Sequence, residues 1–494
     1  MQMAIKLAII NILGNNCDKG PDKQKGGYDL SERCAVILAA GDGTRMRSKA
    51  PKVLCRVLFR PMLGWVLDNC TGAGIGQTCV VVGAGGEEVR RMLPEGCHTA
   101  LQAERLGTGH AVMCARDFIR QHSEKDVLIL YGDAPFIAPD IIDTAYRQHT
   151  AAGNDVTVIT AEVGDPTGYG RIIRQGEALL SIVEHRDADD AQKAIKEINS
   201  GAYWFKAAAL LEALDRIGCS NSQGEYYLPD AVAAVRQAGG KAAACLCADE
   251  QSVQGANDRK GLALLNDIAR RRVLEALMEQ GVDIPFDDGV VIDARAVIGT
   301  DTTVLPGSMI IGNTVIGSGC TIGPGAVIED STLGDSCVIK DTYITGSVLE
   351  EEVKIGPYSQ VRPGSHLAKG VKIGNFVEIK NANLGEGTKS AHLTYIGDAD
   401  IGARVNFGCG VVVVNYDGYA KHRTVVGDDA FIGCNTNLVA PIKVGNRAYT
   451  AAGSTVAIDV PDDALVIARA RETVKEGRVP ELKEKLRKKK EEQR

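Results

Sequence analysis

A six-residue repeat in the second half of the chain restricts the possible fold more than any other feature. Aliphatic side chains recur at steps of six from Ile292 to Ile328, resume from Ile355 to Ile379 and return from Val426 to Val444. An α-helix repeats every 3.6 residues and an isolated strand every two, so neither produces this period. A parallel β-solenoid does, because each short strand turns one aliphatic side chain inward and each corner needs a small residue.

Glycine supports this interpretation of the repeat. It makes up 56 of the 494 residues, about 11% against ~7% in ordinary proteins, and it commonly follows the repeating aliphatic residue. The repeat is interrupted between residues 384 and 424. Loops protrude where a solenoid is interrupted and often carry functional groups, so we expect a site there.

The first half of the chain has a different pattern. Short apolar runs occur at 34–40, 78–85, 126–133 and 155–163, and helix-length segments lie between them at 61–72, 108–122 and 139–152. This alternation predicts a mostly parallel α/β sheet with right-handed crossovers. Ligands bind beyond the carboxyl ends of such strands, where the Gly41 to Gly43 and Tyr131 to Asp133 segments lie.

These patterns predict five segments. They are a flexible N-terminal extension over 1–33, a Rossmann-like domain over 34–257, a linker helix within 258–283, a β-helix over 284–475 and a charged tail over 476–494. The role of the extension stays open, because its short apolar stretch lacks the features of a secretory signal.

Charge and cysteine content exclude several classes of protein. The net charge of −7 argues against a nucleic-acid partner, and no apolar run reaches the ~18 to 20 residues of a membrane-spanning helix. The 14 cysteines include no Cys-x-x-Cys pair and match neither a zinc site nor a disulfide framework. We therefore expect reduced thiols and a cytoplasmic protein.

A glycine-rich loop follows the first predicted strand. It reads LAAGDGTRM over 38–46, and Pro51-Lys52 follows shortly after. Glycine lets backbone N–H groups approach phosphates, and Arg45 and Lys52 supply positive charge. The loop matches neither a Walker A motif nor G-x-G-x-x-G, and a purely structural turn is the alternative.

Further motifs accompany this loop in a fixed order. They are LQAERLGTGHAV (101–112), YGDAPFI (131–137), GYGRI (168–172), IVEHRDA (182–188), EINSG (197–201) and QGANDR (254–259). This order is typical of sugar-nucleotide pyrophosphorylases. With the solenoid that follows, the chain closely resembles the bacterial bifunctional N-acetylglucosamine-1-phosphate uridyltransferases / glucosamine-1-phosphate N-acetyltransferases over about residues 34–475.

The resemblance implies a fold and two reactions. The fold is a Rossmann-like nucleotidyltransferase domain followed by a left-handed parallel β-helix of hexapeptide repeats. The β-helix transfers acetyl from acetyl-CoA to glucosamine 1-phosphate, and the first domain then transfers uridylyl from UTP to the product, with Mg²⁺. Family members form homotrimers, make UDP-N-acetylglucosamine for peptidoglycan and other envelope polymers, and place the acetyl-transfer site between subunits.

The resemblance also implies residues for uridylyl transfer. Arg45 and Lys52 would hold the triphosphate and stabilise its developing charge, and Asp133 and Asn257 would hold Mg²⁺. The residues implied in binding UTP and the sugar nucleotide are Leu38, Ala39, Gly41, Gln102, Gly107, Thr108, Tyr131, Gly132, Asp133, Gly170, Glu184, Asn199 and Asn257.

For acetyl transfer the resemblance implies His392 as the general base, a role that suits the pKa range of histidine. Arg362 and Lys380 would bind the phosphate of glucosamine 1-phosphate, and Tyr395 and Asn406 its sugar. The residues implied along acetyl-CoA are Cys409, Asn415, Tyr416, Lys421, Cys434, Ala452 and Arg469.

Two cysteines depart from the family pattern. The family usually has alanine in the stretch around Cys409 and often serine at Cys434. We therefore ask whether these thiols make acetyl transfer sensitive to oxidation or alkylation.

Two alternatives to the bifunctional enzyme remain. One is a uridyltransferase with a regulatory or structural β-helix, against which the His392 and Asn415-Tyr416 segment argues. The other is a non-catalytic scaffold, against which Arg45, Lys52 and Asp133 argue.

Overall fold

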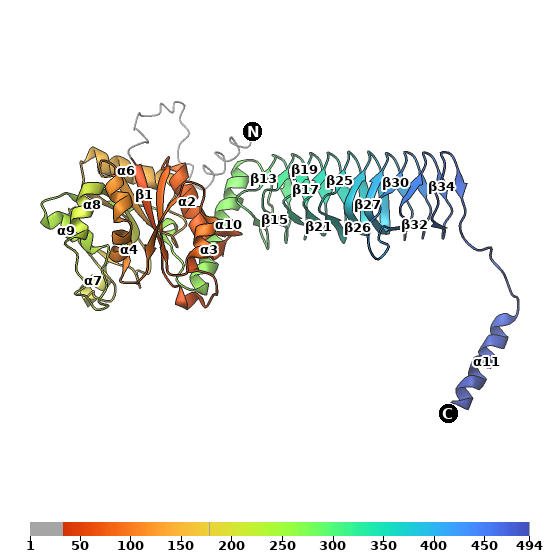
Figure 1. The fold of residues 1–494 in the computed structure, drawn as a ribbon, viewed down its shortest axis with the longest axis horizontal. Helices are drawn as coiled ribbons and strands as arrows, with labels where there is room; N and C mark the ends of the chain where they lie inside the picture. Colours follow the sequence, from red (N-terminus) through yellow and green to blue (C-terminus); the bar gives the residue numbers. More distant parts are fainter. Residues whose placement is uncertain (1–32, 177, 494) are drawn as a thin grey trace. The chain divides into compact units, whose positions relative to one another are not determined.

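The structure, a computed structural model, describes residues 33–176 and 178–493. The chain divides into two compact units (Figure 1). The first extends to Gln280 and also takes in Val291–Arg295, and the second comprises Gly281–Val290 and the chain from Ala296 onward. The predicted N-terminal extension, except for Arg33, lies outside the described residues.

The first unit is built on a sheet whose central strands run in the order β11-β7-β10-β6-β1-β4-β5. β10 is antiparallel to β6 and β7, whereas the other neighbours are parallel, so the predicted mostly parallel sheet is confirmed. β8 and β9 form a hairpin that pairs with β10. The strands are β1 (Arg33–Ala39), β4 (Gln77–Gly83), β5 (His98–Gln102), β6 (Asp126–Tyr131), β7 (Val156–Glu162), β8 (Arg171–Gln175), β9 (Ala178–Val183), β10 (Glu197–Lys206) and β11 (Ala242–Cys247).

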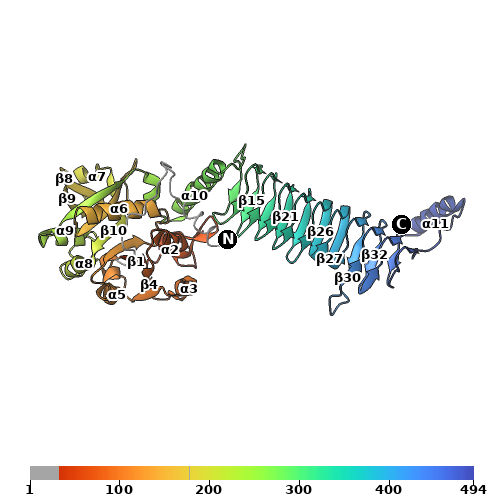
Figure 2. The same cartoon turned by 90° about the horizontal axis from the view of Figure 1, so that it is seen from above.

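Helices cover both faces of this sheet, because its buried strands are apolar on both sides (Figure 2). One core cluster joins the sheet to α4, α5, α8 and α9 through residues such as Phe118 and Leu210. The other joins it to α2 and α6 through Leu63 and Ile142. The helices are α2 (Met62–Gly72), α3 (Glu87–Met92), α4 (Thr108–Cys114), α5 (Arg116–Gln121), α6 (Pro139–Ala151), α7 (Asp190–Lys193), α8 (Ala207–Leu214), α9 (Asp230–Gln237) and α10 (Arg259–Glu279).

One predicted helix is divided in two in the structure, and the linker helix lies within its predicted range. The segment predicted as one helix over 108–122 forms α4 and α5, which are separated at Ala115. α10 begins where the Asp258 side chain accepts a hydrogen bond from the Gly261 N–H at 2.9 Å, an N-cap that satisfies an otherwise unpaired donor.

The second unit is a stack of β-coils that runs from β13 (Val297–Ile298) to β36 (Leu465–Val466) (Figures 1 and 2). Through most of the stack each strand pairs in parallel with the third strand after it, so a coil has three strands and the stack three faces. The aliphatic residues of the repeat stack inside, as Ile298 on Ile316, Val304 on Ile322 and Ile310 on Ile328. The predicted β-helix of hexapeptide repeats is confirmed.

The structure corrects the predicted interruption between 384 and 424. β26 (Lys372–Leu384) and β27 (Lys389–Ile401) pair in register, and β28 (Asn406–Phe407), β29 (Val412–Val414) and β30 (Thr424–Val426) continue the coils. Ser390 and Phe407 fill interior positions, and the step from Ile396 to Ile401 is five residues rather than six, which hid the repeat. The segment 415–423 lies between strands of the coil as a longer loop, where Tyr416 and Lys421 form an antiparallel bridge.

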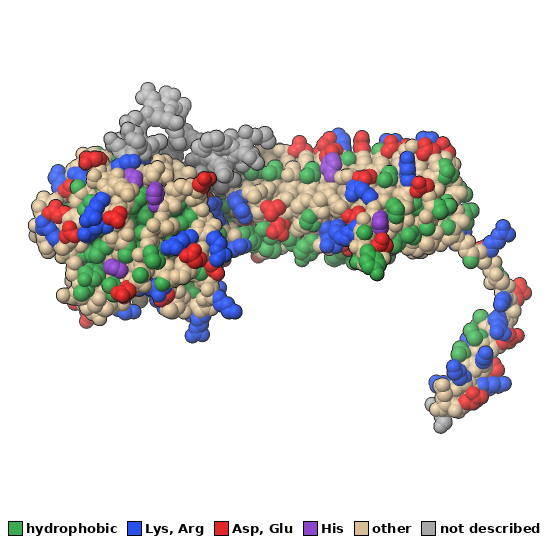
Figure 3. Space-filling view, in the orientation of Figure 1, with side chains coloured by type: hydrophobic (Ala, Val, Ile, Leu, Met, Phe, Trp, Pro, Cys, Tyr) green, Lys and Arg blue, Asp and Glu red, His purple; other side chains and the backbone are tan. Residues whose placement is uncertain are grey.

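Charged side chains gather along one edge of the β-helix (Figure 3). Ion pairs join successive coils, for example Arg404 Nε to Asp429 Oδ1 at 2.7 Å and Arg447 Nε to Asp463 Oδ1 at 2.6 Å. Beyond the coils, α11 (Arg478–Glu492) has no buried residue, as expected of the charged tail. Among the residues that the structure describes, no helix is both long and apolar enough to cross a membrane.

Candidate active sites

The first candidate site is a cavity of about 840 Å³ in the first unit. Loops that follow β1 and β6 contribute to its wall, as expected for an open α/β sheet. All residues predicted for uridylyl transfer line it except Ala39 and Gly132. Ala39 lines a neighbouring hollow of about 400 Å³, and the Gly132 N–H donates to the Leu38 carbonyl at 2.9 Å, which holds β1 and β6 together beneath the cavity.

Two oxygens converge on one cation in this cavity. Lys52 Nζ forms an ion pair with Asp133 and donates a hydrogen bond to Asn257 Oδ1 at 2.7 Å. Asp133 follows β6, whereas Asn257 precedes α10, so the fold brings together residues far apart in the sequence. The ammonium group shows that this pair of oxygens accommodates a positive charge.

The glycine-rich loop is held by close contacts. Gly43 has a φ of 59°, and a Cβ there would lie 2.5 Å from Lys52 Cβ, so only glycine fits. Met46 is fully buried, and Arg259 Nε donates to its carbonyl at 2.9 Å. Between these anchors Arg45 is exposed and lines the cavity.

The loop over 102–108 forms another wall. Gln102 Nε2 donates to the Gly107 carbonyl at 3.0 Å, and Thr108 Oγ1 accepts from the Leu228 N–H at 3.0 Å. Arg105 Nε donates to the Ala40 carbonyl at 2.9 Å and pairs with Asp42. Sequence reasoning missed Arg105, although it lies within the quoted motif LQAERLGTGHAV.

The opposite wall carries buried polar groups. Asn199 Nδ2 donates to Tyr203 Oη at 2.6 Å, and Asn199 Oδ1 accepts from the Gly201 N–H at 3.1 Å. Burial, with the nearby Asp187 and Asp230 charges, raises the pKa of Glu184. Burial likewise raises the pKa of Tyr131, so its hydroxyl stays a hydrogen-bond donor near neutral pH.

The second candidate site lies on the β-helix and includes three cationic side chains. Arg362 is in register with Lys380, and Arg362 Nη1 also donates to Glu378 Oε1 at 2.8 Å. The Lys421 ammonium beside Lys380 lowers the pKa of Lys380. Such a cluster suits a phosphate, which would relieve the repulsion between the two lysines.

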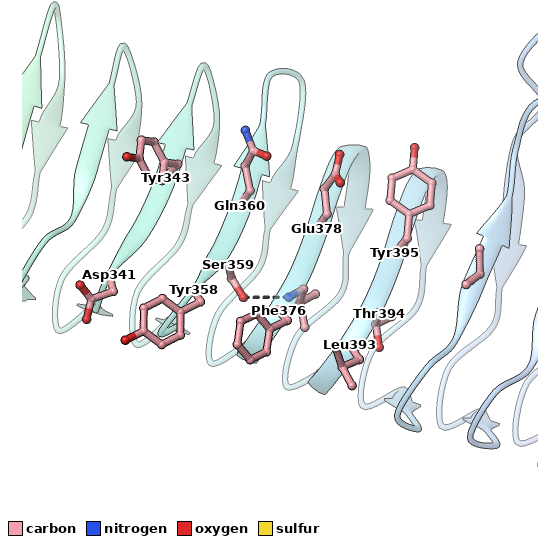
Figure 4. Close-up of a pocket in the computed structure, with 12 residues that line it drawn as sticks. Asp341, Tyr343, Tyr358, Ser359, Gln360, Phe376, Glu378, Leu393, Thr394 and Tyr395 are labelled. Atoms are coloured by element: carbon pink, nitrogen blue, oxygen red, sulfur yellow. Dashed lines mark hydrogen bonds between the residues drawn. The ribbon is translucent and has the colours of Figure 1, made fainter.

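A groove of about 550 Å³ lies on the same face of the coils (Figure 4). Tyr343, Gln360, Glu378 and Tyr395 form a row along it, because they are in register on successive strands. A second row of exposed side chains borders the groove and contains Tyr358, Phe376 and Leu393, each 59 to 61% exposed. Exposed apolar side chains in this number are unusual on a monomer surface.

One edge of the β-helix carries most of the remaining predicted residues. The His392 carbonyl accepts from the Gly410 N–H at 3.4 Å, the Cys409 carbonyl from the Asn435 N–H at 2.7 Å, and the Cys434 carbonyl from the Gly453 N–H at 2.8 Å. Arg469 Cδ lies next to Gly453 in the following coil. The predicted residues His392, Cys409, Cys434, Ala452 and Arg469 therefore follow one another along this edge.

The structure does not bring every predicted residue together. Asn406 is in register with Lys389, at the start of β27, whereas Tyr395 follows the bend of β27 at Leu393, which has a φ of 46°. Within one chain Asn406 and Tyr395 therefore lie on different faces of the coil. Asn415, Tyr416 and Lys421 belong to the longer loop, where Asp417 accepts from His422 Nε2 at 2.7 Å and from two backbone N–H groups.

Comparison with known proteins matches both units. Residues 35–202 match the model of the MobA-like NTP transferase domain, and residues 295–330 and 346–381 match that of the bacterial transferase hexapeptide (six repeats). The bifunctional protein GlmU of Caldanaerobacter subterraneus subsp. tengcongensis is 48% identical over 92% of this chain and 98% of that protein. Those of Halalkalibacterium halodurans and Clostridium perfringens are 45% and 46% identical, over 90% and 91% of this chain and 98% and 99% of theirs.

Proposed function

The chain belongs to the family of bifunctional GlmU proteins, and from that premise we propose which of its residues carry out the two reactions. It is a UDP-N-acetylglucosamine diphosphorylase and a glucosamine-1-phosphate N-acetyltransferase. The observation that carries the assignment is the similarity along both units, which excludes a uridyltransferase alone. We assign uridylyl transfer to residues 34–257, the linker helix to 258–283 and acetyl transfer to 284–475.

In uridylyl transfer a phosphate oxygen of N-acetylglucosamine 1-phosphate attacks the α-phosphorus of UTP, and pyrophosphate leaves. The nucleophile is already an anion, so the protein needs no strong base and must instead align two polyanions and neutralise their charge. Arg45 and Lys52 supply that charge. Leu38, Gln102, Gly107 and Thr108 enclose the nucleotide, and Gly170, Glu184 and Asn199 bind the sugar.

The pair Asp133 and Asn257 fits Mg²⁺. Their oxygens already converge on a cationic group, Lys52 Nζ, and both are the hard donors that Mg²⁺ prefers. No described group of three or more His, Cys, Asp or Glu side chains is arranged to hold a metal, so substrate phosphates and water would have to supply the remaining ligands of Mg²⁺. Bound there, Mg²⁺ would supply charge neutralisation on the phosphates, and Lys52 would add its own positive charge beside it.

In acetyl transfer the amine of glucosamine 1-phosphate attacks the thioester carbonyl of acetyl-CoA, and His392 takes the proton of the amine. The C–S bond then breaks, and CoA leaves as a thiolate that is protonated to the thiol. Arg362 and Lys380 bind the phosphate, and Tyr395 contacts the sugar. Lys421, predicted along acetyl-CoA, we assign to the phosphate instead, because its ammonium group lies beside Lys380. We place acetyl-CoA along the edge formed by Cys409, Cys434, Ala452 and Arg469, where the Arg469 guanidinium suits its phosphates.

A homotrimer accounts for two features of the β-helix. Asn406 lies on a different face from Tyr395, so a second copy would have to supply it to the same sugar. The exposed row Tyr358, Phe376 and Leu393 gives such a copy an apolar surface to cover.

We place the enzyme in the cytoplasm, because every described cysteine is unpaired.

Product analysis with glucosamine 1-phosphate, acetyl-CoA, UTP and Mg²⁺ tests the assignment. The wild-type chain should release CoA and pyrophosphate and form UDP-N-acetylglucosamine. His392→Ala should form none from glucosamine 1-phosphate, yet uridylylate N-acetylglucosamine 1-phosphate at the wild-type rate. Retention of CoA release by His392→Ala would refute the role of His392, and loss of both activities would refute two independent sites.

A further inference from the structure

A buried carboxylate in the second site has no role in the reaction as described so far. Asp398 is 8% exposed and lies at a bend of β27, where its φ is 49°. Asn381 Nδ2 donates to Asp398 Oδ1 at 2.6 Å, and Asn415 Nδ2 donates to Asp398 Oδ2. A buried carboxylate needs such partners, because burying an unpaired charge is costly.

We propose that Asp398 is a positioning residue that fixes the side-chain amide of Asn415 and so presents Asn415 Oδ1 as a hydrogen-bond acceptor to an N–H group of the substrates. The inference rests on the proposed acetyl transfer and adds a residue to it.

The orientation of the Asn415 amide follows from chemistry. An ionised carboxylate only accepts hydrogen bonds, so the atom of Asn415 that faces Asp398 must be the amide nitrogen. The same nitrogen donates to Tyr395 Oη at 3.4 Å, which occupies its second hydrogen. Asn415 Oδ1 has no donor among the described residues, and Asn415 is 7% exposed.

Charge keeps Asp398 in the required ionised state. Although burial opposes it, hydrogen bonds from Asn381 and Asn415 and the Lys380 and Lys421 charges hold the pKa of Asp398 below its usual value. The carboxylate therefore stays an acceptor throughout the pH range in which the amine of glucosamine 1-phosphate becomes a nucleophile.

Space is also reserved for this arrangement. A Cβ at Gly397 would lie 2.5 Å from Tyr395 Cζ and 2.9 Å from Asn415 Nδ2. Glycine at 397 thus lets the Tyr395 ring fold over the backbone and reach Asn415. Tyr395, Gly397 and Asp398 of β27 therefore together orient the side-chain amide of Asn415.

The N–H group in question belongs to one of two substrates. The amine of glucosamine 1-phosphate and the amides of the pantetheine arm of acetyl-CoA share the same donor chemistry. Steady-state kinetics with each substrate varied separately distinguish them, because the lost hydrogen bond changes kcat if the donor is the reacting amine and raises the KM of acetyl-CoA if it is a pantetheine amide.

Asp398→Asn in the full-length enzyme is the main variant. Its amide places an NH2 group against that of Asn381 or Asn415, so the Asn415 amide loses its fixed orientation. We expect kcat/KM for acetyl transfer to fall roughly 10- to 100-fold, the range for a hydrogen bond to a charged group. Removing a negative charge beside Lys380 and Lys421 should not weaken their attraction for the phosphate of glucosamine 1-phosphate.

Asp400→Asn is the matched control. Asp400 lies two residues further along β27 and accepts from Asn383 Nδ2 at 2.7 Å and from Arg423, so it has similar partners but no contact with Asn415. Its acetyl-transfer constants should stay within twofold of wild type. Uridylyl transfer and the thermal midpoint of every variant report on folding.

The exchanged pair Asp398→Asn with Asn415→Asp provides a second test. In this pair the amide introduced at position 398 donates to one oxygen of the carboxylate introduced at position 415, and the other oxygen of that carboxylate remains as the acceptor. We expect the pair to be at least about tenfold more active than Asn415→Asp alone, in which two carboxylates face each other. This comparison holds even if Asp398→Asn does not fold.

Two results would overturn the inference. They are unchanged kcat/KM in Asp398→Asn and an exchanged pair no more active than Asn415→Asp. A wild-type enzyme that releases no CoA would overturn the proposed acetyl transfer itself, which is a distinguishable result.

Discussion

Replacement of Gly107 by alanine should disable uridylyl transfer and leave acetyl transfer intact. Gly107 has a φ of 105° and a ψ of 178°, a conformation that is essentially confined to glycine and costs other residues about 1 to 3 kcal/mol. An alanine Cβ would also lie 2.5 Å from the Tyr226 carbonyl oxygen and 2.9 Å from its nitrogen. Overpacking of this kind adds about 1 to 3 kcal/mol.

The loop can relieve this strain only by moving. Movement would break the hydrogen bond from Gln102 Nε2 to the Gly107 carbonyl and would displace Thr108. All three residues line the nucleotide side of the cavity. Because the two costs together amount to at least about 2 kcal/mol and each ~1.4 kcal/mol corresponds to a tenfold change in rate, we expect kcat/KM for UTP to fall at least about 30-fold. Pyrophosphate release measures the loss, and CoA release by the same preparation shows that the enzyme is folded.

Gly153→Ala is the control for backbone conformation alone. Gly153 has a φ of 65°, but a Cβ there would meet nothing within 4 Å. The variant should lose about 1 kcal/mol of stability and keep both activities. Gly107→Ala with more than half of the wild-type kcat/KM for UTP would refute the argument that this loop conformation positions the nucleotide.

Three further predictions concern the metal, the thiols and a buried carboxyl group. Asp133→Asn, or EDTA added to the wild type, should abolish pyrophosphate release and spare CoA release, whereas uridylyl transfer that persists in EDTA would contradict the Mg²⁺ site. Iodoacetamide should slow acetyl transfer through Cys409 or Cys434, with acetyl-CoA protecting and the Cys409→Ala/Cys434→Ser variant resisting; full activity after peptide mapping shows both thiols alkylated would refute this. Glu184 has a raised pKa, so folding favours its protonated form and the stability it contributes falls as pH rises from the unfolded pKa through the folded one. Glu184→Gln should therefore raise the thermal midpoint at pH 8 while weakening sugar binding, and a variant no more stable than wild type at pH 8 would show that burial of Glu184 is not costly.

The fold of both units could be predicted because the sequence pattern of each half fits only one kind of structure. Apolar runs of seven residues such as 34–40 fit a strand buried on both faces, and the steps of six from Ile292 fit only a coil. The prediction failed between 384 and 424, where Ser390 and Phe407 occupy interior positions that aliphatic residues fill elsewhere. A side chain at such a position is buried by the coils above and below it. The six-residue repeat of aliphatic side chains does not reveal which polar or aromatic residues are buried in this way.

The nucleotide cavity could be predicted because its residues lie in short motifs at strand ends. Arg105 escaped notice because its partner, the Ala40 carbonyl, belongs to the backbone of another motif. Asp398 escaped because its partners Asn381 and Asn415 are 17 residues away on either side, a separation that becomes proximity only once coils stack. Residues of the second site are thus neighbours because they occupy equivalent positions in successive coils. A short sequence motif contains only residues close together in the chain and does not reveal such neighbours.

The edge that starts at His392 has a consequence for the length of its ligand. Its backbone hydrogen bonds link the coils of His392, Cys409, Cys434 and Ala452, and Arg469 follows in the next. Neighbouring strands are about 4.8 Å apart, so the four steps span roughly 19 Å. The number of coils between His392 and Arg469 therefore sets the length of thioester carrier that the edge accepts. Inserting or deleting one whole coil there would lengthen or shorten the accepted carrier by about 4.8 Å.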